Sequence, residues 1–410
     1  MSSQAPLRVL YIHPVAAFGG AARSLLELLR GFPQGAVKAC VLAPRGPAAE
    51  AFAALGAEVL EVAGLAQFDC TRFGHYRGLR WLIVLRELWL LPGTLLGVLR
   101  ARRRWPRVDL IHANEVTLLP AALAAKALYR RPLVVHVRSV QLSEGAPVRR
   151  ALVQWLLRRF ADAVVAIDDT VRASLPERLS VDVVRNGFSA EGAQPAPAGS
   201  REGGGALRVG SVGTLLPLKG VRELLEAART CAARGSSAQF FIAGSNPRDL
   251  SRPWGRLMER LGFAYDMERE IREFISAHGL QASVHPLGFV RDVATLYGSL
   301  DVVCFPSHLG ATGRPVIEAA WLGVPAIAAA AAAPDAFIPG ETGLAVPARD
   351  PEALAAAILQ LDADRAALRR LGEAARRLAE KHFDSRRNAG QMLSLYERLL
   401  DQRKRATLAA

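Results

Sequence analysis

Short apolar runs alternate with helix-period segments along most of the chain, and this alternation constrains the fold more than any other feature. Continuous apolar runs are typical of strands that are buried on both faces, and helices between such strands cover a parallel sheet. The alternation therefore predicts an α/β fold with doubly wound sheets. The first series of runs lies at 7–13, 37–42, 57–62, 108–113, 132–137, 162–167 and 181–186.

Residues 189–205 separate this series from a second one. Gly, Ala, Pro and Ser dominate the segment and no apolar period survives in it, which indicates a linker. We therefore predict two Rossmann-like domains, 1–188 and 206–384, that face a central cleft. A final helix over 385–410 carries an apolar stripe and is a candidate to pack back on the N-terminal domain. The second series of runs lies at 207–213, 239–244, 283–288, 301–306, 324–329 and 343–348.

Composition and charge limit the class of protein. The chain has 410 residues, 51% hydrophobic and 22% charged, which argues against disordered and fibrous classes. Its net charge of +14 favours partners that carry phosphate or an anionic surface. The four cysteines lack metal-binding or disulfide spacing, so we expect no metal site and a reducing compartment. The first residues lack the features of a secretory signal, and we expect a cytoplasmic protein.

Residues 77–105 differ from the rest of the chain. They combine three tryptophans with many leucines and a cluster of arginines, and their only acid is Glu87. The apolar stretch is shorter than the roughly 20 residues that span a bilayer, and Pro92 interrupts it. This pattern favours a helix pair that lies in the interface of an anionic membrane, at the inner face of the cytoplasmic membrane. The alternative is a buried helix pair with a solvated arginine tail. No nucleic-acid recognition motif accompanies the arginines, so we expect no nucleic-acid partner.

Loops that follow predicted strands carry the candidate binding residues. Gly19 and Gly20 stand between a strand and a helix, where backbone N–H groups attract anions, although a simple turn is the alternative. Lys219 ends the loop 213–220, where a cation could neutralise a diphosphate; a solvent-facing lysine is the alternative. The stretch 301–328 contains a strand, a glycine-rich loop and a helix with an acid one turn in. Such an arrangement suits a phosphate together with a sugar or ribose, because a carboxylate binds vicinal hydroxyls.

These motifs resemble those of the GT-B glycosyltransferases of family 4, which are retaining enzymes that use nucleotide sugars. The resemblance covers nearly the whole chain, and its most specific parts are LYGSLDVVCFPS, GRPVIEA and PGETGLAVPARDPEALAAAI. It implies a nucleotide-sugar donor on the C-terminal domain and a lipid-linked or envelope glycan acceptor on the N-terminal domain. It also implies that neither a metal nor another cofactor is required.

The resemblance assigns roles to individual residues. Lys219 would contact the donor diphosphate, and Glu318 would be the second acid of an E-x7-E motif and hold the donor ribose. His136 matches a histidine near the transferred sugar, although a structural histidine is the alternative. These three are the candidate catalytic residues. The candidate substrate-binding residues are Gly19, Gly20, Gly213, Thr214, Gly310, Thr312, Gly313 and Arg314.

Three departures from the family pattern leave other functions open. Gly310 stands where the first acid of E-x7-E is expected, Thr214 replaces a basic residue, and the alanine run 328–333 replaces a Gly-Gly pair. The donor site is therefore reshaped or inactive. The alternatives to a transferase are a non-catalytic module that binds a glycan or a partner, and a nucleotide-sugar epimerase. The long segment 246–280 could shape specificity or contact a partner, and the Asp362–Asp364 pair is expected to cap a helix.

Overall fold

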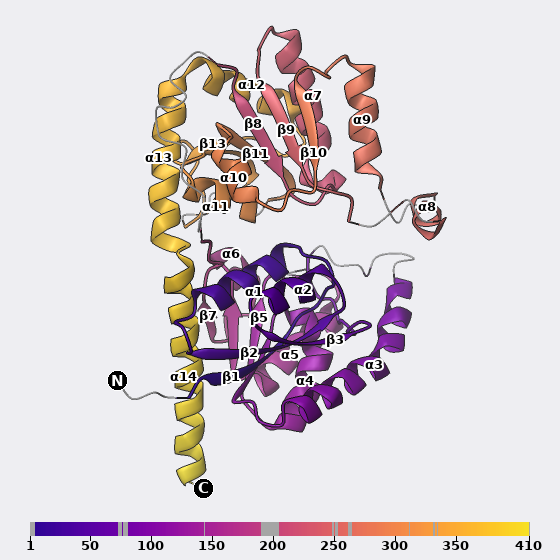
Figure 1. Cartoon of the computed structure of the whole chain (residues 1–410), viewed down its shortest axis with the longest axis vertical. Helices are drawn as coiled ribbons and strands as arrows, with labels where there is room; N and C mark the ends of the chain where they lie inside the picture. Colours follow the sequence, from indigo (N-terminus) through magenta and orange to yellow (C-terminus); the bar gives the residue numbers. More distant parts are fainter. Residues whose placement is uncertain are drawn as a thin grey trace. The chain divides into compact units, whose positions relative to one another are not determined.

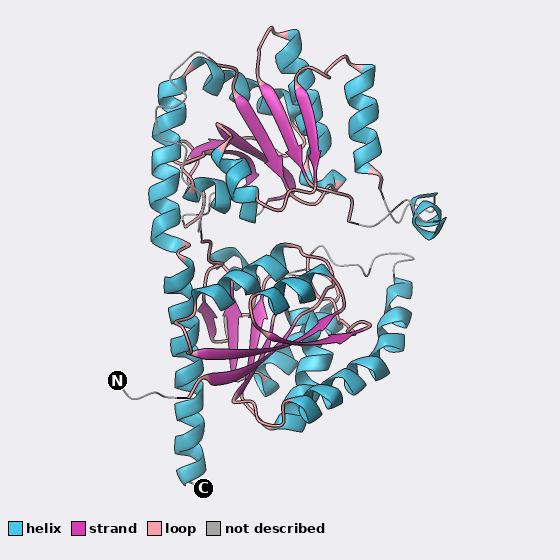
Figure 2. Cartoon of the chain, in the orientation of Figure 1, coloured by secondary structure: helices cyan, strands magenta, loops and turns pink. Residues whose placement is uncertain are grey.

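The computed structural model describes residues 5–72, 76, 81–142, 144–189, 205–247, 250, 253–260, 265–310, 312–330, 333 and 335–409. The chain forms two compact units, one of Met1–Ser189 with Phe383–Ala410 and the other of Ala190–His382. Each unit is a parallel sheet with helices on both faces (Figure 1, Figure 2). Residues 190–204 of the predicted linker lie outside the described residues.

The first unit contains a seven-stranded parallel sheet in the order β3-β2-β1-β4-β5-β6-β7. Two separate cores lie on its two faces. The helices α3 (Ile83–Arg104), α4 (Leu119–Tyr129), α5 (Pro147–Phe160) and α6 (Asp169–Ala173) contribute to one core. The helices α1 (Gly20–Gly31), α2 (Pro47–Ala54) and α14 (Ser385–Ala409) contribute to the other. The strands are β1 (Leu7–Ile12), β2 (Val37–Pro44), β3 (Glu58–Val62), β4 (Leu110–Ala113), β5 (Leu133–Val137), β6 (Ala163–Ala166) and β7 (Val181–Val183).

The second unit contains a six-stranded parallel sheet in the order β10-β9-β8-β11-β12-β13. The helices α7 (Val221–Ala233), α9 (Met267–Ala277), α12 (Pro351–Ala363) and α13 (Arg365–His382) contribute to one core, and α10 (Val293–Gly298) with α11 (Arg314–Trp321) to another. The strands are β8 (Arg208–Val212), β9 (Gln239–Ala243), β10 (Val284–Gly288), β11 (Val302–Gly310), β12 (Ala326–Ala330) and β13 (Gly343–Ala345).

The two sheets confirm the predicted fold class, which is α/β with two Rossmann-like doubly wound units. In each sheet the chain starts in the middle and then reverses its direction of growth, between β1 and β4 in the first unit and between β8 and β11 in the second. In open α/β sheets, ligands bind outside the carboxyl ends of the strands at such a switch point. The loops that follow β1, β4, β8 and β11 are therefore the places to look for a site.

The predicted helix pair at 77–105 is wrong, because the structure has the single helix α3 there, with Pro92 inside it. Pro92 removes one backbone N–H, whose acceptor would be the carbonyl of Leu88. Leu88 is exposed, so water can satisfy that carbonyl and the helix continues. Residues 77–80 lie outside the described residues. None of the described helices is both long enough and apolar enough to cross a bilayer.

Two further predictions concern the second unit. Asp364 accepts a hydrogen bond from the backbone N–H of Ala367 at 2.8 Å, which confirms that it caps α13. The long segment 246–280 contributes α8 (Pro253–Arg260) and α9. Residues 248, 249, 251, 252 and 261–264 of this segment lie outside the described residues.

Three buried imidazoles lie on the face of the first sheet that α1, α2 and α14 cover. His112 Nδ1 is 2.6 Å from the hydroxyl of Tyr396 on α14, and the rings of His112 and His136 are 5.3 Å apart. His13 Nδ1 is 2.9 Å from the side-chain nitrogen of Asn114. Burial, together with the smaller effect of the Arg138 charge, lowers the pKa of His13 and of His112 to about 3. The folded unit therefore keeps these imidazoles neutral.

The stability of the first unit should decrease as the pH falls below about 6.5, the pKa of an unfolded histidine. The unfolded chain binds protons at His13 and His112 there, whereas the folded chain does so only near pH 3. Between pH 7.5 and 5.5 each of these two imidazoles therefore costs about 1.4 kcal/mol of unfolding free energy, and the two together about 2.7. The buried His136 adds a cost of the same sign. Hydrogen exchange of β1 and β4 between pH 7.5 and 5.5 measures this slope. H112F should reduce it, H278Q at an exposed histidine should not, and an equal slope in H112F would contradict the assignment.

Candidate functional site

The loop between β8 and α7 places Lys219 at the carboxyl edge of the second sheet. Gly213 follows β8 with a φ of +150°, and the single 3-10 turn η3 (Pro217–Lys219) ends at the lysine. Gly220 comes next with a φ of +78°, and a Cβ at this position would lie 2.0 Å from the carbonyl oxygen of Pro306. Only glycine allows this approach, so the backbone itself fixes the end of η3 against Pro306 in the middle of β11.

Lys219 is a half-buried cation whose ammonium group lies 5.4 Å from the centre of the Phe305 ring. Burial lowers its pKa. No carboxylate among the described residues forms an ion pair with it. A desolvated ammonium group of this kind gains from an anionic ligand, because the ligand replaces the lost hydration.

The N-terminus of α11 lies against the same aromatic ring. Gly313 is its N-cap, and a Cβ there would lie 2.3 Å from Cζ of Phe305. No described side chain caps this helix, and its first turn contains no acid. Its free N–H groups and partial positive charge therefore suit a phosphate. Phe305 thus brings the predicted residues Lys219 and Gly313 together.

Arg314 and Glu318 lie one turn apart on α11 and form an ion pair. Nε of Arg314 donates to Oε1 of Glu318 at 2.9 Å, and the Glu318 side chain is buried. The resemblance implies that Glu318 holds the donor ribose and that Arg314 binds phosphate and sugar, whereas the structure joins the two side chains to each other. They therefore act as a unit, in which Glu318 orients the guanidinium group and Arg314 balances the charge of the buried carboxylate.

The remaining predicted residues of the second unit lie in the same loops. Thr214 is exposed after Gly213, and Gly310 is the last residue of β11, paired with Ala330. The hydroxyl of Thr312 is buried and has no hydrogen-bond partner among the described residues. Two of these positions, Thr214 and Thr312, offer hydroxyl groups, whereas Gly310 offers only its backbone.

The predicted residues of the first unit are Gly19, Gly20 and His136. Gly19 is the N-cap of α1, whose first turn has no acid, and a Cβ at Gly19 would meet nothing within 4 Å. His136 lies inside β5 and is only 3% exposed. Burial lowers its pKa well below the usual value. In this structure the imidazole is an interior group, which favours the structural alternative for its immediate role.

Arg138 is the residue that the sequence analysis missed. It follows β5, and its Nε donates to Oδ1 of Asn114 at 2.8 Å, while Nη1 donates to Oδ1 of Asn186 at 2.7 Å. Its Nη2 is 3.3 Å from Nδ1 of His136. These three acceptors are neutral, and they orient the guanidinium group. An asparagine directly after a predicted strand, as at Asn114, is the sequence signal that could have found this cluster.

The cluster around Arg138 reaches the start of α1. The side-chain nitrogen of Asn114 donates to the carbonyl oxygen of Ala21 in the first turn of that helix at 3.2 Å. The carboxylate of Glu115 lies beside the cluster and accepts hydrogen bonds from the backbone N–H groups of Val116 and Arg138 and from the Ser139 hydroxyl. A guanidinium group and a helix N-terminus thus meet at the carboxyl edge of the first sheet, where both favour a polar or anionic ligand.

Comparison with known families accounts for most of the chain. The family described as Glycosyltransferase Family 4 matches residues 18–191, and the family described as Glycosyl transferases group 1 matches residues 197–378. The chain belongs to glycosyltransferase family 4. This membership confirms the resemblance that the sequence motifs indicated.

Individual relatives agree with this family. A 2-deoxystreptamine glucosyltransferase of Streptomyces kanamyceticus is 26% identical over 275 residues, which cover 60% of this chain and 65% of the relative. The lipopolysaccharide core biosynthesis mannosyltransferase LpcC of Rhizobium leguminosarum bv. viciae is 27% identical over 331 residues, covering 78% of this chain and 84% of that protein. The crystal structure of Anabaena Alr3699/HepE in complex with UDP and glucose has a TM-score of 0.73 at 21% identity, covering 95% of this chain and 99% of that one. This last likeness shows that the family 4 glycosyltransferase has the GT-B fold.

Replacing Gly313 with alanine tests whether Phe305 is locked between α11 and Lys219. G313A should destabilise the second unit, because the new Cβ overlaps the ring and overpacking costs about 1–3 kcal/mol. G19A is the matched control, since Gly19 is also an N-cap glycine but has open space around it. Hydrogen exchange of α11 and of α1 gives the two losses of stability. Equal losses would mean that Phe305 moves away freely.

Proposed function

We propose that this chain transfers a glycosyl unit from a nucleoside diphosphate sugar to a lipid-linked or cell-envelope glycan, with retention at the anomeric carbon. The observation that carries the proposal is that two positive groups lie close to the Phe305 ring, the Lys219 ammonium group and the N-terminus of α11. Two phosphates can share two such groups. The names of the relatives support a sugar donor and a glycan product.

The proposed chemistry is electrostatic. The bond between the anomeric carbon and the diphosphate oxygen breaks as negative charge grows on the leaving group. Lys219, Arg314 and the N–H groups of α11 stabilise that charge, which lowers the barrier without a side-chain nucleophile. The acceptor hydroxyl attacks from the face that the diphosphate leaves, and the leaving phosphate takes its proton. Because these protein groups supply the positive charge, we propose that no divalent cation is required.

We place the acceptor on the first unit, at the carboxyl edge of its sheet. Arg138 and the first turn of α1 present donors there. His136 lies behind Arg138, so we assign it to orienting the guanidinium group through the contact at Nη2. This assignment replaces a direct contact between His136 and the sugar.

A nucleotide panel identifies the donor, and K219A tests its site. Thermal unfolding with UDP, GDP, ADP, CMP and dTDP, and with their sugars, should show that one nucleotide stabilises the chain, by about 2.7 kcal/mol at 100 times its Kd. In K219A, donor turnover in EDTA, including slow transfer to water, should fall about 100-fold or more while the melting temperature without ligand changes little.

K404A is the control, because Lys404 is an exposed lysine on α14. Unchanged turnover in K219A would exclude Lys219 from the donor site. If no nucleotide stabilises the folded chain, a non-catalytic binding module replaces the transferase as the function.

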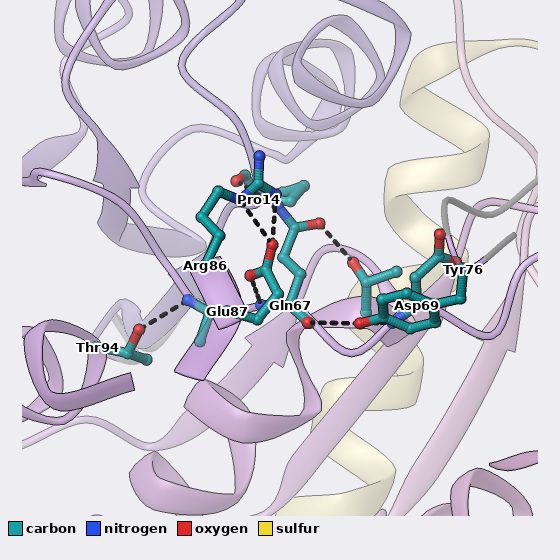
Figure 3. Close-up of polar contacts among 9 residues, drawn as sticks. Pro14, Gln67, Asp69, Tyr76, Arg86, Glu87 and Thr94 are labelled. Atoms are coloured by element: carbon teal, nitrogen blue, oxygen red, sulfur yellow. Dashed lines mark hydrogen bonds and ion pairs between the residues drawn. The ribbon is translucent and has the colours of Figure 1, made fainter. Parts of the chain in front are cut away.

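We further propose that α3 attaches the chain peripherally to an anionic membrane, at the inner face of the cytoplasmic membrane. Its inward side combines the core residues Val98 and Ala101 with polar groups. The carboxylate of Glu87 accepts a hydrogen bond from the N–H of Gln67, and the hydroxyl of Thr94 accepts one from the N–H of Ala66, both at 2.7 Å. Figure 3 shows these contacts between α3 and the preceding loop. Most of its large apolar residues are exposed, with Trp89 84% exposed. The exposed apolar side chains of α3 and its N-cap residue are Leu82, Leu85, Leu88, Trp89, Leu95, Leu96 and Leu99.

The helix α5 extends this surface, and arginines surround it. Val148, Leu152 and Trp155 are exposed at positions i, i+4 and i+7, so they share one side of α5. The guanidinium group of Arg149 lies 5.8 Å from the ring centre of Trp81, just before α3. An apolar patch with basic neighbours suits the boundary between acyl chains and anionic headgroups, where each nearby arginine adds about 1 kcal/mol.

The double variant L85S/W89S should reduce binding to vesicles of phosphatidylcholine and phosphatidylglycerol at least 10-fold. A buried Leu or aromatic side chain is worth about 1.5–3 kcal/mol, so partial insertion of both exceeds the 1.4 kcal/mol of a tenfold change. Cosedimentation measures the binding, and L408S on α14, another exposed leucine, should leave it unchanged. Equal binding of L85S/W89S and the unmodified chain would contradict the proposal.

A further inference from the structure

A carboxylate that no motif assigns lies at the same corner as Lys219. Glu223 is in the first turn of α7, four residues after the lysine. Its Oε1 is 2.9 Å from Nε2 of His308, and its Oε2 is buried with no hydrogen-bond partner among the described residues. A buried carboxylate oxygen without a donor is unfavourable and calls for a reason, since such groups are normally satisfied.

The contacts of His308 fix its tautomer. Nε of Arg349 donates to Nδ1 of His308 at 3.4 Å, so the imidazole proton is on Nε2 and is donated to Glu223. A neutral imidazole therefore separates a guanidinium group from a carboxylate. Arg349 has a φ of +62°, which is unfavourable for a residue with a side chain. Strained backbone of this kind is concentrated at functional sites, where the surroundings enforce it.

The contact between Gly220 and Pro306 connects Glu223 and His308 to the candidate donor site. Lys219 and Glu223 lie on either side of Gly220 along the chain, and His308 follows Pro306 by two residues. The end of β11 contributes no carboxylate of its own, because residue 310 is glycine. Glu223 is thus the acid that the α7 side of the fold presents close to Lys219.

We propose that Oε2 of Glu223 accepts a hydrogen bond from a hydroxyl of the transferred sugar, and that His308 and Arg349 are positioning residues for this carboxylate. The inference rests on the proposed function. A carboxylate repels the diphosphate but binds neutral hydroxyl groups, and the first sugar beyond a diphosphate bound at Lys219 offers them. The imidazole bond to Oε1 leaves one oxygen for the ligand, so Glu223 selects a single hydroxyl rather than a vicinal pair.

The test compares a nucleotide with its own nucleotide sugar. The full chain is titrated by calorimetry with UDP and UDP-glucose, and with GDP and GDP-mannose. For each pair this gives the ratio of the dissociation constant of the nucleotide to that of the nucleotide sugar. E223Q should weaken the nucleotide sugar about 10-fold and leave the nucleotide within twofold, because only the sugar hydroxyl loses its charged acceptor. H308Q should lower the same ratio, whereas a residue with only a structural role would weaken both ligands alike.

Two further variants serve as controls. E226Q removes a carboxylate from the same helix, and the ratio should stay as in the unmodified chain. E223D keeps the charge on a shorter stem and should lie between E223Q and the unmodified chain, which covers the case that E223Q folds poorly. An unchanged ratio in E223Q, or an equal loss for both ligands, would overturn the assignment while the transferase function stands. If the unmodified chain binds neither a nucleotide nor a nucleotide sugar, the assignment and the proposed function both fail.

Discussion

The approach of Gly220 to the carbonyl of Pro306 is the contact on which the candidate donor site depends. A Cβ would lie 2.0 Å from that oxygen, so the backbone just after η3 and the middle of β11 touch directly. Three consequences follow along the chain. Lys219 stands immediately before the contact, Glu223 starts the helix after it, and Phe305 precedes Pro306 and supports the lysine. A side chain at residue 220 would push the two loops apart and separate all of these groups, so the position is a constraint on the site rather than a detail of one turn.

In the first unit, polar groups are buried beneath the helices α1 and α14. Tyr396 of α14 contacts His112, and Arg138 contacts both Asn114 and His136. Burial and the nearby guanidinium charge both disfavour protonated imidazoles. The positive charge at this edge of the sheet therefore comes from Arg138 and not from histidine. Because Tyr396 of α14 contacts His112, the last helix of the chain is part of the first unit and covers its buried polar groups.

The alternation of apolar runs and helices predicted the class of both sheets, because buried parallel strands read as continuous apolar runs. It also placed Lys219 and Gly313 correctly in loops, since residues after strands gather at one edge. The burial and the contacts of individual side chains could not be predicted from the sequence. The period of a strand puts His136 and Arg138 on the same face, but it does not say which of them the covering helices bury. The spacing of Arg314 and Glu318 permits an ion pair, yet a free pair of ligand-binding groups has the same spacing. The sequence favoured two helices around Pro92 because it does not show that the Leu88 carbonyl, which Pro92 leaves without a donor, is at an exposed position.

The exposed apolar side chains of α3 are not the ones that attach this helix to the first unit. Hydrogen bonds from the loop at 66–67 to Thr94 and Glu87, together with Gly97 against Val62, hold its inner side. In a helix of a globular protein the apolar stripe supplies most of the stability, and the outer side is free to vary. Here polar groups and the core residues Val98 and Ala101 attach the helix, and the outward leucines and Trp89 contribute little to packing within the described residues. An exposed apolar surface of this size normally carries an aggregation cost that a binding partner offsets. Its separation from the core means that the affinity for a membrane can change by substitution without a matching change in the sheet beneath it.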